Sequence, residues 1–122
     1  MTQKEMINII PTLQKLVGIK LPLKSSYAVF RLAKEIDAQK EFFIEEERKL
    51  IEKYKGSISP EGRISFEEPE NFELFAKEYS ELNNLEVEIK EQLPIVIKLD
   101  SVEGGDFAPA DFFSLEGVID FE

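Results

Sequence analysis

The sequence contains no cysteine, no histidine and no tryptophan. The absence of cysteine excludes disulfides and thiol nucleophiles, and without histidine the most common general base is missing. Zinc sites built from these two residue types are excluded as well. The sequence also lacks a phosphate-binding glycine loop, a dinucleotide fingerprint and a nucleophile elbow. Carboxylate pairs remain as catalytic groups, but only geometry identifies them. We therefore expect a protein that is not an enzyme and that uses no cofactor.

Long hydrophobic runs are missing too. No apolar stretch approaches the roughly 20 residues that a membrane span requires. The first ten residues carry charge and have no apolar centre, so we expect no signal peptide, no membrane contact and a cytoplasmic location. The chain has 122 residues, of which 43% are hydrophobic and ten are phenylalanine. This length and composition predict a single domain over residues 1–122 with a core of its own.

Charge is divided unevenly along the chain. Residues 1–60 hold eleven basic and eight acidic residues, whereas residues 61–122 hold four basic and seventeen acidic residues. The acidic half repels nucleic acid and attracts basic surfaces, so we expect a protein partner and no direct nucleic-acid binding. The simplest interpretation of this acidity is solubility. A sharper one is mimicry of a nucleic-acid backbone. A basic cluster in the first half is expected to pair with the acidic half of the same chain or of a neighbour; its members are Lys15, Lys20, Lys24, Arg31 and Lys34.

Two helices are predicted in the first half of the chain. The first covers Thr2 to Val17, with Pro11 either kinking it or opening a second short turn. The second begins with Ser25 or Ser26 as its cap and reaches Tyr54, where Gly56 stops it. Its apolar stripe consists of Val29, Ala33, Ile36, Phe43, Leu50 and Tyr54. Thirty residues span about 45 Å, more than a compact domain of this length, so part of this helix projects or pairs with another chain.

The second half mixes short elements. Ile58 to Phe66 predicts a β-hairpin around a Pro-x-Gly turn that leans on a helix. A third helix opens at Pro69 and ends at Asn83, with a buried stripe of Phe72, Phe75, Tyr79 and Leu82. Strands are predicted over 85–90 and 95–99, and a short helix over 110–115. The expected fold class is α+β and mostly α: one long helix packed with two or three shorter helices, a small β-hairpin and a short C-terminal strand pair.

Candidate functional residues fall into two groups. Asp100, Glu103 and Asp106 flank two glycines and have the ligand type that Ca²⁺ prefers, although an acidic turn explains them more simply. Phe42, Phe43 and Ile44 are consecutive on a helix, so at least one of them lies outside the core and marks an interface. The other residues assigned to an interface are Glu78, Glu81, Glu86, Glu88 and the nearly terminal Phe121, which is either tied down or inserted into a partner.

Four segments in sequence order carry a resemblance. They are residues 20–27 leading into the long helix, the run 45–54, the stretch 82–89 and the segment 109–116. Together they resemble small acidic proteins of unknown function encoded by tailed bacteriophages and prophages. The resemblance implies a phage origin. Given that origin, we expect a virion or assembly-associated protein that binds a phage structural protein and forms oligomers. The alternative is a counter-defence or host-takeover inhibitor of a bacterial factor. Either would work in the cytoplasm of the infected host, the first also within the virion.

Overall fold

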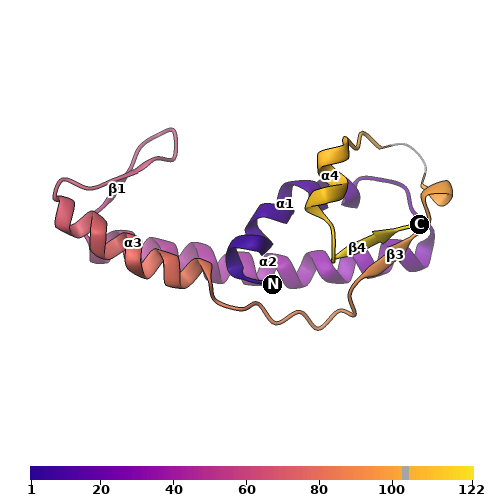
Figure 1. The fold of residues 1–122 in the computed structure, drawn as a ribbon, viewed down its shortest axis with the longest axis horizontal. Helices are drawn as coiled ribbons and strands as arrows, with labels where there is room; N and C mark the ends of the chain where they lie inside the picture. Colours follow the sequence, from indigo (N-terminus) through magenta and orange to yellow (C-terminus); the bar gives the residue numbers. More distant parts are fainter. Residues whose placement is uncertain (103–104) are drawn as a thin grey trace.

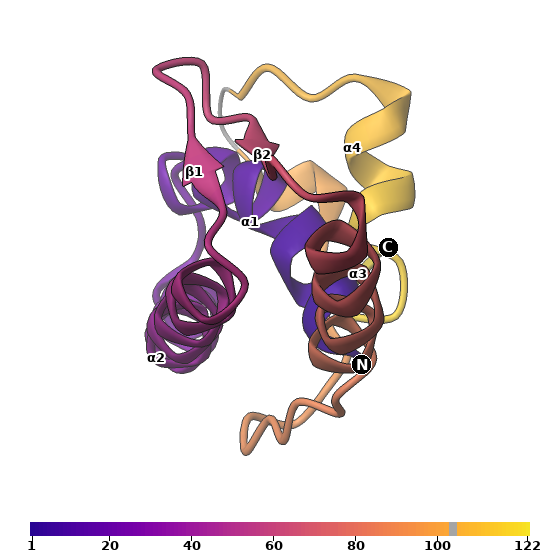
Figure 2. The same ribbon diagram turned by 90° about the vertical axis from the view of Figure 1, so that its left-hand side faces the viewer.

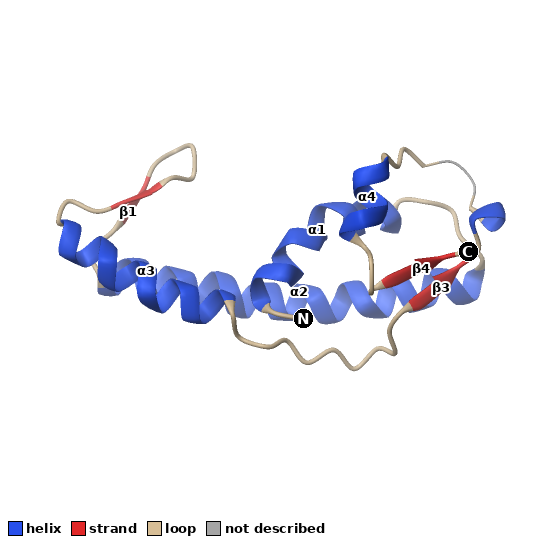
Figure 3. Ribbon diagram, viewed as in Figure 1, coloured by secondary structure: helices blue, strands red, loops and turns tan. Residues whose placement is uncertain are grey.

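The structure is a computed structural model that describes residues 1–102 and 105–122. The elements, in chain order, are α1 (Gln3–Val17), α2 (Leu23–Lys53), β1 (Ser57–Ile58), β2 (Ile64–Ser65), α3 (Pro69–Asn83), β3 (Ile95–Ile97), the 3₁₀ turn η1 (Leu99–Ser101), α4 (Pro109–Ser114) and β4 (Ile119–Phe121). Figures 1 and 3 show one long helix with shorter helices and two small strand pairs placed along it. This confirms the predicted fold class.

The molecule has two regions, which meet along α2 (Figure 1). The body comprises the described residues of 1–41 and 85–122. Its core joins α1, the first half of α2 and the β3–β4 pair, and α4 packs on α1. The largest fully buried side chains are aliphatic apart from one methionine: Met6, Leu16, Leu32, Ile36, Ile97 and Leu115. β3 and β4 run parallel with Ile95 opposite Ile119, and the residues between them, including α4, supply the crossover that parallel strands require.

The arm comprises residues 42–84. Here the second half of α2 continues beyond the body and α3 runs back beside it (Figure 1). Figure 2 shows the two helices in end view, with the β1–β2 hairpin joining them at the far end. The hairpin is antiparallel, Ser57 pairs with Ser65, and Gly62 supplies the positive φ that its turn needs. The predicted hairpin and the predicted start at Pro69 are therefore confirmed.

The start of the first helix follows its local sequence closely. Thr2 caps α1 and Glu5 completes a capping box, because each side chain binds the other residue's backbone N–H. α1 continues through Pro11, and its axis bends partway along (Figure 1). Pro11 has no N–H to donate to the preceding turn, an arrangement that bends helices. Of the two alternatives for Pro11, a single helix that continues through it is the one observed.

The second helix begins earlier than predicted. Pro22 is its N-cap residue, no side chain caps it, and the backbone N–H of Ser26 already bonds to the carbonyl of Pro22. The cap assigned to Ser25 or Ser26 is therefore wrong, because both residues lie within the helix. At the other end, Lys55 rather than Gly56 adopts the left-handed conformation. Gly56 is needed for a different reason: a Cβ there would lie 2.6 Å from the ring of Phe66.

Two other predictions are corrected. Residues 85–90 form no strand, although Val87 is buried as the alternation predicted. They have no strand to pair with. Glu86 forms an isolated bridge with Thr2, and the backbone N–H groups of Lys90 and Glu91 donate to the Glu35 carboxylate. Phe72 was placed on the buried stripe of α3, but it is 55% exposed. α3 packs mainly against one helix, so its buried stripe is narrower than the pattern suggested.

Within the described residues, no helix combines the length and the apolar composition that a membrane crossing requires.

Candidate functional site

The candidate site is a groove between α2 and α3, which we call the arm groove. Its lining residues are Phe42, Glu46 and Leu50 from α2, Glu78, Glu81 and Leu82 from α3, and Leu85 just beyond α3. Leu82 is buried and forms the floor, while Phe42 and Leu85 remain 44% and 47% exposed. The groove has a volume of about 250 Å³. It therefore offers an apolar floor, open to solvent, between glutamate side chains.

One glutamate of the groove, Glu78, is held by neighbouring donors. A hydrogen bond from Tyr54, and a second from Lys53, lower the pKa of Glu78. The Lys53 Nζ lies 3.0 Å from Glu78 Oε1, and Lys49 forms a similar pair with Glu46 at 3.2 Å. Both lysines are more than half exposed, so these pairs are weak and exchange readily with other cations. Among the described residues, Glu81 has no ion-pair partner, which leaves the groove an acidic site.

Aromatic rings hold the two helices of the groove together. Phe43 contacts the ring of Tyr79, which stacks on Phe75 with centroids 5.1 Å apart. Phe66, just after β2, packs on Phe75 at 4.9 Å and so ties the hairpin to α3. The Tyr79 hydroxyl donates a 2.7 Å hydrogen bond to Glu47 on α2. Burial, reinforced by this hydrogen bond to Glu47, raises the pKa of Tyr79 to about 12.

A second unusual surface lies at the start of α2, on the body. Leu23, Tyr27 and Phe30 follow one another at helical spacing and are 87%, 59% and 53% exposed. The rings of Tyr27 and Phe30 stack with centroids 6.2 Å apart. We call this surface, with the neighbouring cations Lys24, Arg31 and Lys34, the basic aromatic face. It lies opposite the helix side that buries Val29, Leu32 and Ile36 in the core.

Two cations of this face lie close to its aromatic rings. Lys34 lies 5.5 Å from the centroid of Phe30, and Arg31 lies 5.9 Å from that of Tyr27. Arg31 also contacts Glu91 at 3.2 Å, an ion pair between α2 and the segment that follows α3. Lys15, a further member of the predicted basic cluster, pairs with Asp111 on α4 at 3.1 Å. A hydrogen bond from the Ala108 amide, followed by one from Lys15, lowers the pKa of Asp111. The predicted pairing between the basic cluster and the acidic half is thus realised within the chain at Lys15 and Arg31.

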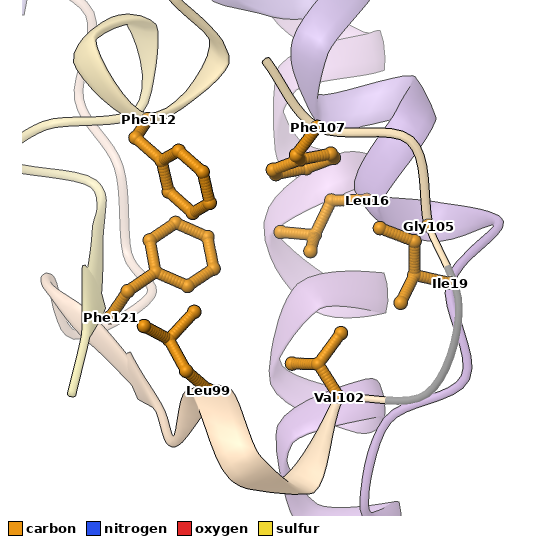
Figure 4. A pocket seen from close by; sticks show the side chains of 8 residues that line it. All are labelled: Leu16, Ile19, Leu99, Val102, Gly105, Phe107, Phe112 and Phe121. Atoms are coloured by element: carbon orange, nitrogen blue, oxygen red, sulfur yellow. The ribbon is translucent and has the colours of Figure 1, made fainter. Parts of the chain in front are cut away.

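A partly open cavity of about 250 Å³ lies in the body (Figure 4). It is lined by Leu16, Ile19, Leu99, Val102, Gly105, Phe107, Phe112 and Phe121. The rings of Phe107, Phe112 and Phe121 meet edge to face, and the ring centroids of Phe112 and Phe121 are 4.9 Å apart. Among the described lining residues, no side chain is polar or titratable.

The structure brings together three of the residues that the sequence assigned to an interface. Phe42, Glu78 and Glu81 line the arm groove, although Phe42 is 36 residues from Glu78 in the chain. Phe43 is 6% exposed and belongs to the aromatic packing of the arm, whereas Ile44 is half exposed outside the groove. Glu86 lies near the chain start, where it pairs with the N-terminal amine, and Glu88 is exposed. Phe121 lies in β4 beside the body cavity.

The acidic residues near the glycine pair form no recognisable metal site in the part of the chain that is described. Asp100 lies in η1 and Asp106 follows Gly105, but Glu103 is outside the described residues. Across residues 1–102 and 105–122, no group of three acidic side chains is placed to hold a metal ion.

The sequence pointed to the cations of the basic aromatic face, as members of the basic cluster, but the exposed apolar stripe beside them was not predicted. The signal was present, because residues 23–34 contain three cations and no acidic residue in a chain of net charge −10. Leu23, Tyr27 and Phe30 also form a second apolar stripe at positions i, i+4 and i+7. The predicted core stripe, with Val29, Ala33 and Ile36, lies on the opposite side of the helix.

Comparisons of the chain with protein-family models, with curated proteins and with solved structures found no match.

Proposed function

We propose that this protein is non-enzymatic and acts by binding another protein at the arm groove. The observation that carries this proposal is the groove itself, in which the exposed side chains of Phe42 and Leu85 and the buried Leu82 lie between glutamates. An exposed apolar patch with a polar rim is typical of a protein-binding surface. The glutamates select a partner segment that is apolar and basic, because oppositely charged surfaces attract and like charges repel.

The same features favour a role in assembly, in keeping with the resemblance to phage-encoded proteins. A long helix with α3 packed along one side leaves the groove open to a partner where the arm meets the body, as a component that links neighbours requires. The partner would then be a phage structural protein or a further copy of the chain, in the infected bacterial cell or in the virion. These are proposals that rest on the groove and on the sequence resemblance.

Inhibition of a host factor by nucleic-acid mimicry is the second candidate. It is supported by the seventeen acidic residues in the second half of the chain. Against it, a mimic requires a row of unpaired charges, and several of these glutamates have internal partners. Glu78 pairs with Lys53, Glu86 with the N-terminal amine and Glu91 with Arg31. We therefore rank assembly above inhibition.

Affinity capture with matched baits tests the proposal. The wild-type chain and the Phe42→Glu variant would each be used to capture proteins from infected cells, with Phe113→Glu as the control for a ring elsewhere that is more exposed still. Proteins held by the wild type and the control but lost with Phe42→Glu would support binding at the groove. Virion proteins among them favour assembly, and nucleases or defence factors favour inhibition. Identical captures with all three baits would contradict a role for the groove.

A further inference from the structure

The basic aromatic face is exposed at a cost to its own helix. The first turn of α2 contains no acidic residue and no side-chain cap, and it carries Lys24. The N-terminal end of a helix is electropositive, so a lysine there is unfavourable and an acid would stabilise it. Leu23, the first residue of the helix, is 87% exposed, which leaves its apolar side chain in water. The stability of the fold explains neither the lysine in the first turn nor the exposed leucine, whereas a partner that covers the face explains both.

The charge of this face limits what the partner is. Pairing two copies of the face with each other would bring together Lys24, Arg31 and Lys34 from both chains, which repel. Nucleic acid is disfavoured by the net charge of −10 on the whole chain. The remaining partner is an acidic protein surface with an apolar floor that accepts a helix carrying residues at i, i+4 and i+7. Helix-in-groove recognition uses this spacing.

The arm groove of the same protein meets this description. Phe42, Leu82 and Leu85 supply its apolar surface, and Glu78 and Glu81 its acidic edge. A cavity of about 150 Å³ is sufficient for a benzene ring. The groove, at about 250 Å³, therefore has room for one aromatic side chain of an incoming helix.

Because the proposed function assigns a basic, apolar partner segment to the arm groove, we infer that this segment is the basic aromatic face of a second copy. The inference rests on that proposed function and names its partner. In the pair, Tyr27 or Phe30 of one copy enters the groove of the next. Lys24 and Lys34 of the first copy then lie near Glu78 and Glu81 of the second. There they compete with Lys53, which forms the exposed ion pair with Glu78 within the chain.

The two surfaces do not overlap, and this determines the kind of assembly. Both involve α2, but their nearest members, Lys34 and Phe42, are eight positions apart in one helix, a separation of about 12 Å. Each copy can therefore use its face and its groove at the same time. A head-to-tail contact of this kind continues into a ring or an open chain instead of stopping at a symmetric dimer.

Sedimentation velocity with complementary variants tests the inference. Phe30→Glu blocks the face but keeps the groove, and Glu81→Lys blocks the groove but keeps the face. We expect the wild type to gain mass as concentration rises. We expect each variant alone to associate at least about thirtyfold more weakly, as for a central interface residue. An equimolar mixture of the two variants should form a dimer of twice the chain mass and nothing larger, because only one intact face–groove pair remains.

Controls keep the test decisive. Circular dichroism would establish that both variants fold, which is expected because both positions are exposed. Phe113→Glu, the same substitution on α4, should leave self-association unchanged. A wild type that stays monomeric up to millimolar concentration, association that survives either variant, or a mixture that remains monomeric would each overturn the inference. Capture of another protein through Phe42 would, in those cases, still support the proposed function.

Discussion

The body and the arm are stabilised in different ways, although one helix runs through both. The body buries aliphatic side chains from both ends of the chain, including Met6, Leu32 and Ile97. The arm consists of two helices and a hairpin, and the rings of Phe43, Phe75 and Tyr79 form its packing. Two packed helices cover only one side of each other, so few apolar side chains of the arm are buried: Phe43, Ile51, Phe75 and Leu82. Most of the buried core, and with it most of the stability, therefore belongs to the body.

Removing a core side chain from the body should have the largest effect. Leu32 is completely buried within α2, and Leu32→Ala is expected to lower the free energy of unfolding by about 4 kcal/mol, in the upper part of the range for buried leucines. The loss should affect the whole chain, because the rest of the molecule depends on the body core. Denaturant unfolding followed by circular dichroism measures it. Leu23→Ala, on the exposed side of the same helix, should change stability by at most about 0.5 kcal/mol.

The matching change in the arm should cost less and act locally. Phe75 is buried, and Phe75→Ala is expected to lower the stability of the arm by about 3 kcal/mol, at the low end of the range for buried phenylalanines. Amide hydrogen exchange should rise in residues 42–84 and stay almost unchanged in α1 and β3. Phe72→Ala, three residues away but exposed, is the matched control. Equal loss of protection in body and arm would mean that the two regions unfold as one cooperative unit, which would contradict a separately stabilised arm.

How much the sequence revealed also differs between the two regions. Most arm elements were predictable because local residues define them: Pro60 and Gly62 for the hairpin, Pro69 for the start of α3. The path of residues 85–90 in the body was not, because it depends on Glu35, more than fifty positions earlier, and on the chain start. Pairing of β4 with β3 was equally non-local. Strands of three residues with distant partners leave little periodic signal.

In the candidate site, too, the individual residues were predictable from the sequence and their arrangement was not. Phe42, Glu78 and Glu81 could each be selected from the sequence, as an apolar side chain next to a core position and as acids on a helix. That they share one groove depends on the antiparallel packing of α2 and α3, which no local pattern encodes. The basic aromatic face, by contrast, is a local feature of residues 23–34. It was within reach of sequence reasoning once both sides of the helix were considered.

The smallest expected effect concerns the hydrogen bond that ties α3 to α2. Tyr79→Phe removes the bond to Glu47 and should destabilise the arm by about 0.5–1 kcal/mol, a value reduced for partial exposure. In the folded chain the pKa of Tyr79 is raised to about 12 from an ordinary 10. A raised pKa means that this contribution is complete below pH 10 and is lost as the pH rises toward 12.

The wild type should therefore lose arm stability over this pH range, while Tyr79→Phe should lose less. Hydrogen exchange is too fast to follow at such pH, so thermal unfolding monitored by circular dichroism is the suitable measurement. Tyr27→Phe, whose ring is exposed on the body, should behave as the wild type does. If the Tyr79 variant and the wild type lost stability in parallel, the Glu47 hydrogen bond would contribute nothing. The arm would then depend on ring packing alone, which would sharpen its contrast with the body.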